Sequence, residues 1–204
     1  MDSNIEEMEL INSAKKDPKA FGVLYERYVE RIYNYIYFRT GSVHDSEDLT
    51  AKVFFKAMNN IGRYRNMGVP FSAWLYRIAH NQVANYYRDQ SRKNEISIDD
   101  LPMPNLTTKQ IAPEASALQN QEMEYLMMVI NDLPKQKREL ILLKYVQKLS
   151  NAEIGVILNK SEGAIKSLYH RTLLELREKL EKDTAELALR RGSIEIPGGR
   201  HEQD

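Results

Sequence analysis

The stretch Ser150-Asn-Ala-Glu-Ile-Gly-Val-Ile-Leu-Asn-Lys-Ser-Glu-Gly-Ala-Ile-Lys-Ser-Leu-Tyr-His-Arg171 decides the fold of the C-terminal part of the chain. Ser150 and Glu153 have the spacing of a capping box, in which each side chain bonds a backbone amide of the other residue. A short apolar helix follows, Asn159-Lys160 form a turn, and Ser161 caps a second, longer helix. A short helix, a tight turn and a longer helix predict a helix-turn-helix.

The second helix of this motif has an apolar inner face and a polar, basic outer face. In a helix-turn-helix the second helix enters the major groove, and its first residues lie near base edges. Lys166 and Arg171 suit guanine or phosphate, and Ser167 and Glu162 suit base edges. An ordinary helical hairpin with a solvated charged side is the alternative interpretation. The candidate DNA-reading residues are Ser161, Glu162, Lys166, Ser167, His170 and Arg171.

The rest of the chain also has the apolar spacing of helices, and no stretch alternates as a half-buried strand does. We predict helices over 17–39, about 45–59 and about 71–92, and again from about 113 to 182. Residues 94–118 have the proline-containing composition of a linker. The predicted fold class is therefore all-α, with two small helical domains joined by a flexible linker. The predicted domains are 1–94 and 119–182, with a linker over 95–118 and a disordered tail over 183–204.

Composition narrows the possible functions. The 204 residues carry 29 basic and 29 acidic side chains, so the formal charge is zero. That zero arises from blocks of opposite sign, because residues 1–95 and 131–182 are net basic and 96–130 are net acidic. A polyanionic partner is therefore not excluded. The chain has no cysteine, its apolar runs are too short to cross a bilayer, and its first residues show no signal peptide. We expect a cytoplasmic protein without membrane insertion.

Aromatic residues are concentrated in the N-terminal half, mostly at inward helix positions that indicate a core. Tyr64 stands between Arg63 and Arg65 in a predicted loop, and Tyr87 adjoins Arg88. Exposed aromatic side chains among basic ones suit stacking on unpaired bases. This pattern predicts a surface that binds single-stranded nucleic acid.

These stretches also carry a resemblance to a known family. His44-Asp-Ser-Glu-Asp-Leu-Thr50, with Pro70-Phe-Ser-Ala-Trp-Leu-Tyr-Arg-Ile-Ala-His-Asn81, resembles region 2 of bacterial RNA polymerase sigma factors. Leu133-Pro-Lys-Gln-Lys-Arg-Glu-Leu140, with the helix-turn-helix, resembles their region 4. Two matching regions with only a linker between them look like the extracytoplasmic-function (ECF) group, and the resemblance covers about 17–93 and 120–182.

The resemblance implies two partners, core RNA polymerase and promoter DNA. Region 2 of the family binds the largest polymerase subunit and opens the minus-ten element, and region 4 binds the second-largest subunit and the minus-thirty-five element. The implied polymerase-facing residues are Asp45, Asp48, Leu49 and Phe54, although Leu49 and Phe54 also suit the core. The implied minus-ten residues are Arg63, Tyr64, Arg65, Trp74, Arg77, His80, Asn81, Asn85, Tyr87, Arg88, Arg92 and Lys93. Trp74 also suits the core.

The chain departs from the family pattern at several positions. Ala51 and Lys52 stand where the family often has glutamine and an acidic residue, Met58 replaces a common tryptophan, and Asn85 replaces a frequent aspartate. These changes affect the expected polymerase contact and base preference. In the family the linker passes near the polymerase active centre, which Asp99, Asp100 and Glu114 would suit, although a solvated linker is the alternative.

The expected function is promoter-specific initiation by a sigma factor that has no catalytic chemistry, cofactor or metal of its own. A conventional helix-turn-helix regulator acting without core polymerase is the main alternative. An enzyme is a weaker one: a carboxylate site of Glu47 and Asp48 is disfavoured because adjacent helix residues point about 100° apart, whereas Asp45 and Asp48 share a helix face and could hold a metal ion. An anti-sigma factor covering the surface around Asp48 is a regulatory hypothesis that follows from the family. The tail over 183–204 is either regulatory or frayed.

Overall fold

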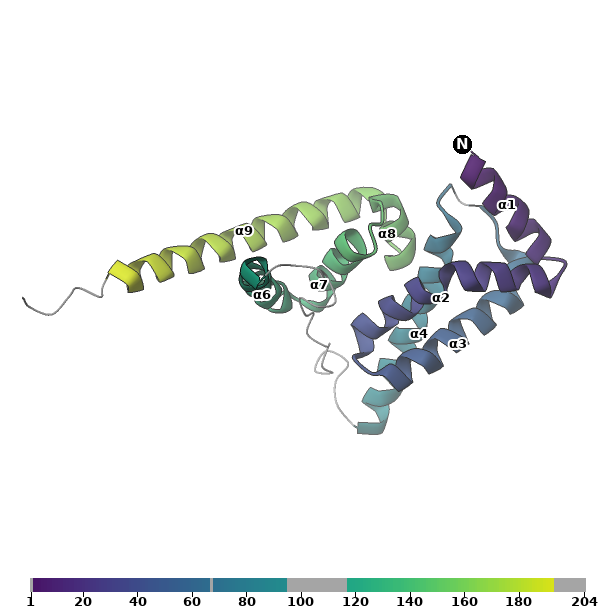
Figure 1. Ribbon diagram of the computed structural model, residues 1–204, viewed down its shortest axis with the longest axis horizontal. Coiled ribbons are helices and arrows are strands. Elements are labelled where there is room, and N and C mark those ends of the chain that lie inside the picture. The colour runs from purple at the N-terminus through teal and green to yellow at the C-terminus, as the bar shows by residue number, and fades with distance from the viewer. Residues whose placement is uncertain (1, 67, 95–116, 193–204) are drawn as a thin grey trace, which may run out of the picture.

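The computed structural model describes residues 2–66, 68–94 and 117–192. Every element in these ranges is helical, and together they form two domains (Figure 1). The N-terminal domain holds α1 (Asp2–Ala14), α2 (Pro18–Thr40), α3 (Val43–Asn60) and α4 (Phe71–Asn94). The C-terminal domain holds α6 (Ala117–Asn131), α7 (Lys135–Ile141), α8 (Asn151–Leu158) and α9 (Glu162–Gly192). The predicted all-α class with two helical domains is confirmed.

Local signals explain where the N-terminal helices begin and end. Asp17 caps α2 by accepting a hydrogen bond from the Lys19 amide at 2.9 Å, and Pro18 occupies the first helical position, where no amide is needed. Gly41, with φ of 65°, ends α2 in the left-handed conformation that glycine adopts without strain. Ser42 then caps α3 through the Asp45 amide. The chain therefore reverses between α2 and α3 within two residues.

The helix-turn-helix forms as its sequence predicts. Ser150 Oγ accepts from the Glu153 amide at 3.2 Å, and Glu153 Oε2 accepts from the Ser150 amide at 2.8 Å, which confirms the capping box. Asn159 ends α8 with φ of 54°, and Ser161 caps α9 by accepting from the Ala164 amide. The second helix is therefore held at a fixed position relative to the first.

Replacing Ser150 with alanine is expected to destabilise the C-terminal domain by about 1 kcal/mol, because the Glu153 amide then lacks its cap. Hydrogen exchange of the amides in α8 measures the loss. Ser150→Asp is the matched control, because its carboxylate still accepts from the same amide and protection should be retained.

The structure differs from the sequence prediction at several boundaries. Helix α1 was not predicted at all. A single π-helical turn spans Leu142–Val146 between α7 and α8. Helix α9 continues to Gly192, so residues 183–192 are helical where a disordered tail was predicted, and 193–204 lie outside the described residues. Of the predicted linker, 95–116 also lie outside them, and residues 117 and 118 begin α6.

Candidate polymerase and nucleic-acid interfaces

The predicted polymerase-facing residues on α3 fall into two groups. Asp48 is exposed and lies 3.8 Å from Lys52, whereas Asp45 is half-buried and accepts a hydrogen bond from Tyr86 at 3.0 Å. Leu49 and Phe54 are each only 4% exposed. These two side chains lie in the core, which is the alternative that the sequence left open for both.

Other apolar side chains of this surface are exposed. Phe55 is 65% exposed and Met58 is 41% exposed, both on α3. Tyr25 of α2 is also exposed and packs edge-on against Phe54, with ring centroids 4.8 Å apart. Neighbouring residues on a helix point about 100° apart, so three successive apolar residues, Val53, Phe54 and Phe55, cover about 200° of α3 and cannot all face the core of a helix that has one solvated side. Sequence reasoning missed Phe55 and treated Met58 only as a departure from the family.

The loop before α4 differs from the prediction of an exposed aromatic ring. Arg63 and Arg65 are exposed, but Tyr64 is only 7% exposed. Its ring packs against Phe71 and Trp74, with centroids 5.1 Å and 5.3 Å away. Burial raises the pKa of the Tyr64 hydroxyl. The prediction that Tyr64 is exposed for base stacking was therefore wrong, because its ring instead fills an aromatic cluster.

Helix α4 presents a polar face. Asn81, Asn85 and Arg88 are exposed at spacings of four and three residues, so they share one side of the helix. Arg88 Nη1 donates to Asn85 Oδ1 at 3.1 Å. Arg92 is exposed as well, whereas the side chain of Lys93 lies outside the described ones. Two side-chain amides and one guanidinium group are thus brought together on one side of α4. This arrangement suits hydrogen bonding to bases and to phosphates.

The remaining predicted minus-ten residues on α4 are less exposed than that polar face. Trp74 and Arg77 are half-buried. Tyr87 is half-buried and donates its hydroxyl proton to the Arg39 carbonyl oxygen. His80 faces the C-terminal domain, where its Nδ1 lies 2.9 Å from Glu139 Oε1. Tyr87 and His80 are therefore engaged within the protein in this conformation.

The first turns of α9 present the predicted recognition residues to solvent. Glu162 pairs with Lys166 at 3.0 Å, and Ser167 donates to the Gly163 carbonyl at 3.0 Å. Ser161 uses its hydroxyl as the helix cap. All six predicted residues are exposed: Ser161, Glu162, Lys166, Ser167, His170 and Arg171. The helix begins with the exposed, partly basic surface that a recognition helix needs.

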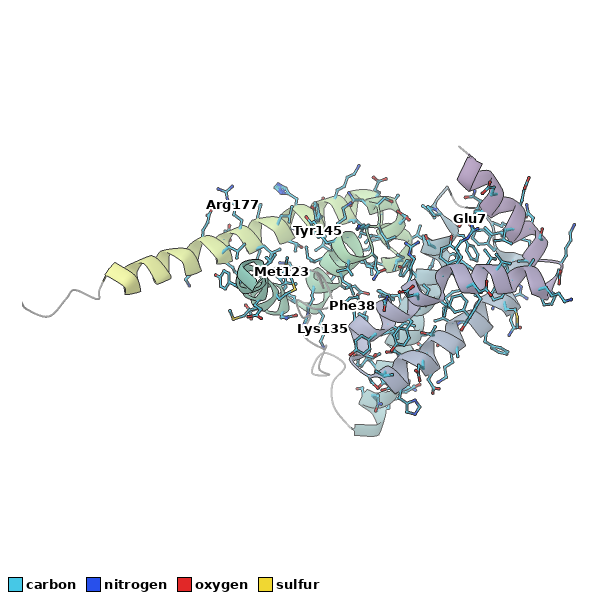
Figure 2. The ribbon with its side chains drawn as sticks, in the orientation of Figure 1. Glu7, Phe38, Met123, Lys135, Tyr145 and Arg177 are labelled. Atoms are coloured by element: carbon cyan, nitrogen blue, oxygen red, sulfur yellow. The ribbon has the colours of Figure 1, made fainter. Side chains whose placement is uncertain are left out.

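An apolar groove runs along the C-terminal domain between α6, the π-helical turn and α9. It has a volume of about 570 Å³ and an almost wholly apolar lining. Figure 2 labels Met123 on α6 and Tyr145 on the π-helical turn, which both line it. Other lining residues are Leu126, Ile130, Leu173 and Leu180. A groove of this kind suits the apolar side of a partner helix.

Two further observations concern metals and membranes. Among the described residues, no three histidine or acidic side chains gather where they could hold a metal ion. The same residues include no helix with the length and apolar character needed to cross a bilayer.

A two-domain helical architecture with a helix-turn-helix and an exposed recognition helix defines a DNA-binding protein. The family described as Sigma-70 region 2 matches residues 24–93, and the one described as Sigma-70, region 4 matches 123–176. The chain belongs to the sigma-70 family, in its ECF group. The predicted family is confirmed.

Individual relatives agree with this assignment. The chain is 34% identical over 177 residues to the ECF RNA polymerase sigma factor BldN of Streptomyces coelicolor, covering 86% of this chain and 66% of that protein. It is 31% identical over 172 residues to SigW of Bacillus subtilis, covering 81% of this chain and 91% of that protein.

Solved structures share the fold at lower identity. The sigma factor RpoE in complex with the anti-sigma factor NepR, from Bartonella quintana, is similar with a TM-score of 0.59 at 21% identity. That similarity covers 80% of this chain and 98% of RpoE. CnrH in complex with the cytosolic domain of CnrY gives a TM-score of 0.57 at 20% identity, covering 87% and 98%.

Proposed function

We propose that this protein is a sigma subunit that joins core RNA polymerase and directs it to a specific promoter. The observation that carries this proposal is the presence of both family regions in one chain, in order, each with its own exposed surface. The protein would act in the cytoplasm, where polymerase and chromosome are, and would perform no catalysis itself.

The proposed polymerase contact has one part in each domain. On α3 the acidic Asp48 and the exposed apolar Phe55 and Met58 offer the mixed acidic and apolar surface that suits a partner helix. Burial of Leu49 and Phe54 favours a supporting role for these two side chains beneath that surface. In the C-terminal domain, the apolar groove beside α9 suits a helix of the second-largest subunit.

The proposed promoter contact is likewise divided. Arg63, Arg65 and the polar face of α4 around Asn81 and Arg88 would meet the minus-ten element, and Arg92 and Lys93 would hold phosphates. The exposed start of α9 would enter the major groove at the minus-thirty-five element. The charged groups on both surfaces predict a steep loss of affinity as salt rises.

Transcription in a purified system tests the whole function. Core polymerase with this protein should give a defined transcript from a promoter mapped after overexpression of the protein, and core polymerase alone should not. A conventional helix-turn-helix regulator would bind duplex DNA but fail to co-purify with core polymerase. Absence of promoter-dependent initiation together with absence of core binding would refute the proposal.

Replacing Phe55 with arginine is expected to weaken binding to core polymerase about tenfold without affecting folding. The side chain is 65% exposed, so the change removes apolar contact area and adds a charge that only a partner would bury. Fluorescence anisotropy of labelled protein titrated with core enzyme measures the affinity. Val23→Arg on α2, also an exposed apolar position at 47%, is the matched control. Equal affinity of the two variants would argue against the α3 surface.

An anti-sigma factor remains part of the proposed regulation. Such a partner would compete with polymerase for the surface around Asp48 and for the apolar groove. Co-purification from the native cell, followed by release on addition of core enzyme, would identify it.

A further inference from the structure

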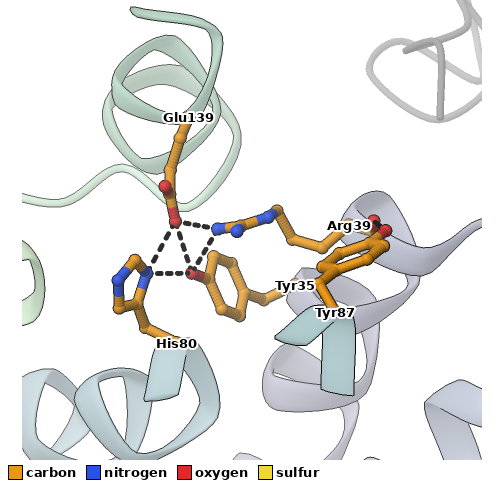
Figure 3. Close-up of polar contacts among 5 residues, drawn as sticks. All are labelled: Tyr35, Arg39, His80, Tyr87 and Glu139. Carbon is orange, nitrogen blue, oxygen red and sulfur yellow. Dashed lines mark hydrogen bonds and ion pairs between the residues drawn. The ribbon is translucent and has the colours of Figure 1, made fainter. Parts of the chain in front are cut away.

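A cluster of four side chains joins the two domains. Glu139 of α7 places one carboxylate oxygen, Oε1, among Tyr35 and Arg39 of α2 and His80 of α4 (Figure 3). Tyr35 donates its hydroxyl proton to that oxygen at 2.8 Å, His80 Nδ1 lies 2.9 Å from it, and Arg39 forms an ion pair with it. Arg39 Nη1 also donates to the Tyr35 hydroxyl at 3.1 Å. We refer to these four residues as the Glu139 cluster.

The cluster is largely removed from water. Tyr35 is fully buried, and the side chains of Glu139 and Arg39 are only 10% and 12% exposed. A buried carboxylate is costly unless it is paired and hydrogen-bonded, and three donors from the other domain meet that need here. Separation of the domains would exchange these donors for water, so the cluster defines a closed conformation.

A second polar contact and a helix pair extend the same interface. Tyr76 of α4 donates its hydroxyl proton to Gln147 Oε1 at 2.5 Å, and both residues are buried. Helix α8, the first helix of the helix-turn-helix, packs against α4. The domains are therefore in contact at two polar positions and along one helix pair.

A second guanidinium group lies near Arg39 at this interface. Arg138 of α7 is buried, and its pKa is lowered by desolvation and by the nearby Arg39. Within the described residues, Nε of Arg39 and Nε of Arg138 are buried without a hydrogen-bond partner. Arg39 pairs with Glu139, and the nearby Arg138 guanidinium adds a second positive charge beside Arg39. Repulsion between these two guanidinium groups works against closure, so the closed conformation is one that a partner can open.

The closed conformation brings the two proposed DNA surfaces close together. Helix α8 touches α4 and is only eight residues long, about 12 Å, and α9 starts four residues after it ends. Elements centred at minus ten and minus thirty-five lie about 25 base pairs apart, or roughly 85 Å along a duplex at about 3.4 Å per base pair. The 22 residues 95–116 can reach about 75 Å when extended. Only an open arrangement can serve both elements.

We propose that the Glu139 cluster is a self-inhibitory contact, which holds the free protein closed and must break before both promoter elements can be bound. The inhibitory part of this proposal rests on the proposed function, whereas the closed conformation of the free protein does not. Polymerase would supply the opening energy through its separate contacts with each domain.

Fluorescence energy transfer within the full-length chain measures closure directly. The natural chain has no cysteine, so Lys56→Cys on α3 and Glu178→Cys on α9 introduce the only two labelling sites, both at exposed positions. The otherwise unchanged protein should show one dominant high-transfer population. Glu139→Gln and Arg39→Met should each raise the low-transfer population about tenfold.

Matched controls separate opening from unfolding. Glu175→Gln removes the Lys137–Glu175 ion pair, which lies wholly within the C-terminal domain, and should leave the transfer unchanged. Because Glu139 and Arg39 belong to different domains, a shared opening effect cannot arise from a folding defect in one domain. Glu139→Gln and Arg39→Met remove the same contact, so the double variant should have no larger low-transfer population than either single variant.

The outcomes distinguish the two levels of the proposal. The closed conformation would be overturned if the low-transfer population dominated in the unsubstituted protein. It would also be overturned if neither Glu139→Gln nor Arg39→Met changed the size of that population. Opening by Glu139→Gln without increased binding of free protein to a duplex holding both promoter elements would overturn the inhibitory role. Failure of the proposed function itself would show instead as no transcription with core polymerase, whatever the energy transfer.

Discussion

Replacing Gly155 with alanine is expected to destabilise the C-terminal domain by about 2 kcal/mol and to reduce transcription from the cognate promoter at least tenfold. A Cβ at this position would lie 2.7 Å from the Lys160 carbonyl oxygen and 3.6 Å from the Glu162 amide nitrogen. The Lys160 amide in turn donates to the Gly155 carbonyl at 2.8 Å, so the turn cannot move away without losing that bond. Overpacking against rigid backbone typically costs about 1–3 kcal/mol.

Gly163 offers a matched control in the same motif. It lies in the first turn of α9, and a Cβ there meets nothing within 4 Å. Gly163→Ala should therefore leave stability unchanged or raise it by up to about 1 kcal/mol, because alanine favours a helix over glycine. The two substitutions are chemically identical and differ only in the space available.

Two signals measured on the same sample locate the effect of Gly155→Ala. Hydrogen exchange of peptides from 151–176 reports the C-terminal domain, whereas fluorescence of Trp74, the only tryptophan, reports the N-terminal domain. In Gly155→Ala, hydrogen exchange of 151–176 should become faster, whereas the midpoint of the urea unfolding transition followed by Trp74 fluorescence should not change. Equal protection in Gly155→Ala and Gly163→Ala would contradict the close approach of α8 to the turn.

Acidification from pH 7.5 to pH 5 is expected to shift the free protein toward the open conformation by more than about tenfold. Burial lowers the pKa of His80 from 6.5 to about 4, with a smaller contribution from repulsion by Arg39. The groups facing His80 are Tyr35 and Arg39 on α2 and Glu139 on α7, and Arg138 of α7 lies near Arg39. The imidazole is therefore neutral in the closed conformation at pH 7.

The sign of the effect follows from linkage. In the open conformation His80 regains its ordinary pKa of about 6.5, so the open form binds a proton first as the pH falls. Closure is unaffected by His80 above about pH 6.5 and is progressively lost between pH 6.5 and 4. Below pH 4 both conformations are protonated at this residue, and its contribution no longer changes.

Energy transfer between the two introduced labels measures this titration. His80→Gln removes the titrating group but keeps an amide N–H that can donate to Glu139, so its closed population should change little between pH 7.5 and 5. If the energy transfer of the unsubstituted protein and of His80→Gln changed equally with pH, the opening would be due to the titration of a group other than His80. A constant transfer in the unsubstituted protein would show that His80 is solvated in the closed state.

Much of the local structure could be predicted from sequence, because it depends on neighbours along the chain. The capping box at Ser150 and Glu153, the left-handed Asn159 and the Ser161 cap all follow from local hydrogen bonding. The exposed start of α9 follows from helical periodicity. Helix α1 was missed because its acidic first residues show little amphipathic pattern, although Ile11 is fully buried against the rest of the domain.

The exposure of particular side chains was harder to predict. Tyr64 between two arginines has the sequence of a surface residue, yet the return of the chain into α4 places Phe71 and Trp74 against its ring. Positions 54 and 55 are both phenylalanine, yet Phe54 is buried and Phe55 is 65% exposed. Such assignments depend on which helix packs on which face.

The sequence by itself determined the all-α class, the helix-turn-helix and the sigma-70 family, since each depends on short-range periodicity, capping and residue order. Only the tertiary structure decided that Glu139 meets Arg39 and His80, residues 100 and 59 positions away. No local pattern marks that pairing, because a charged residue on a helix has the same appearance whether it faces water or another domain. The physical reason is desolvation: the carboxylate acquires its partners only when the two domains exclude water from it.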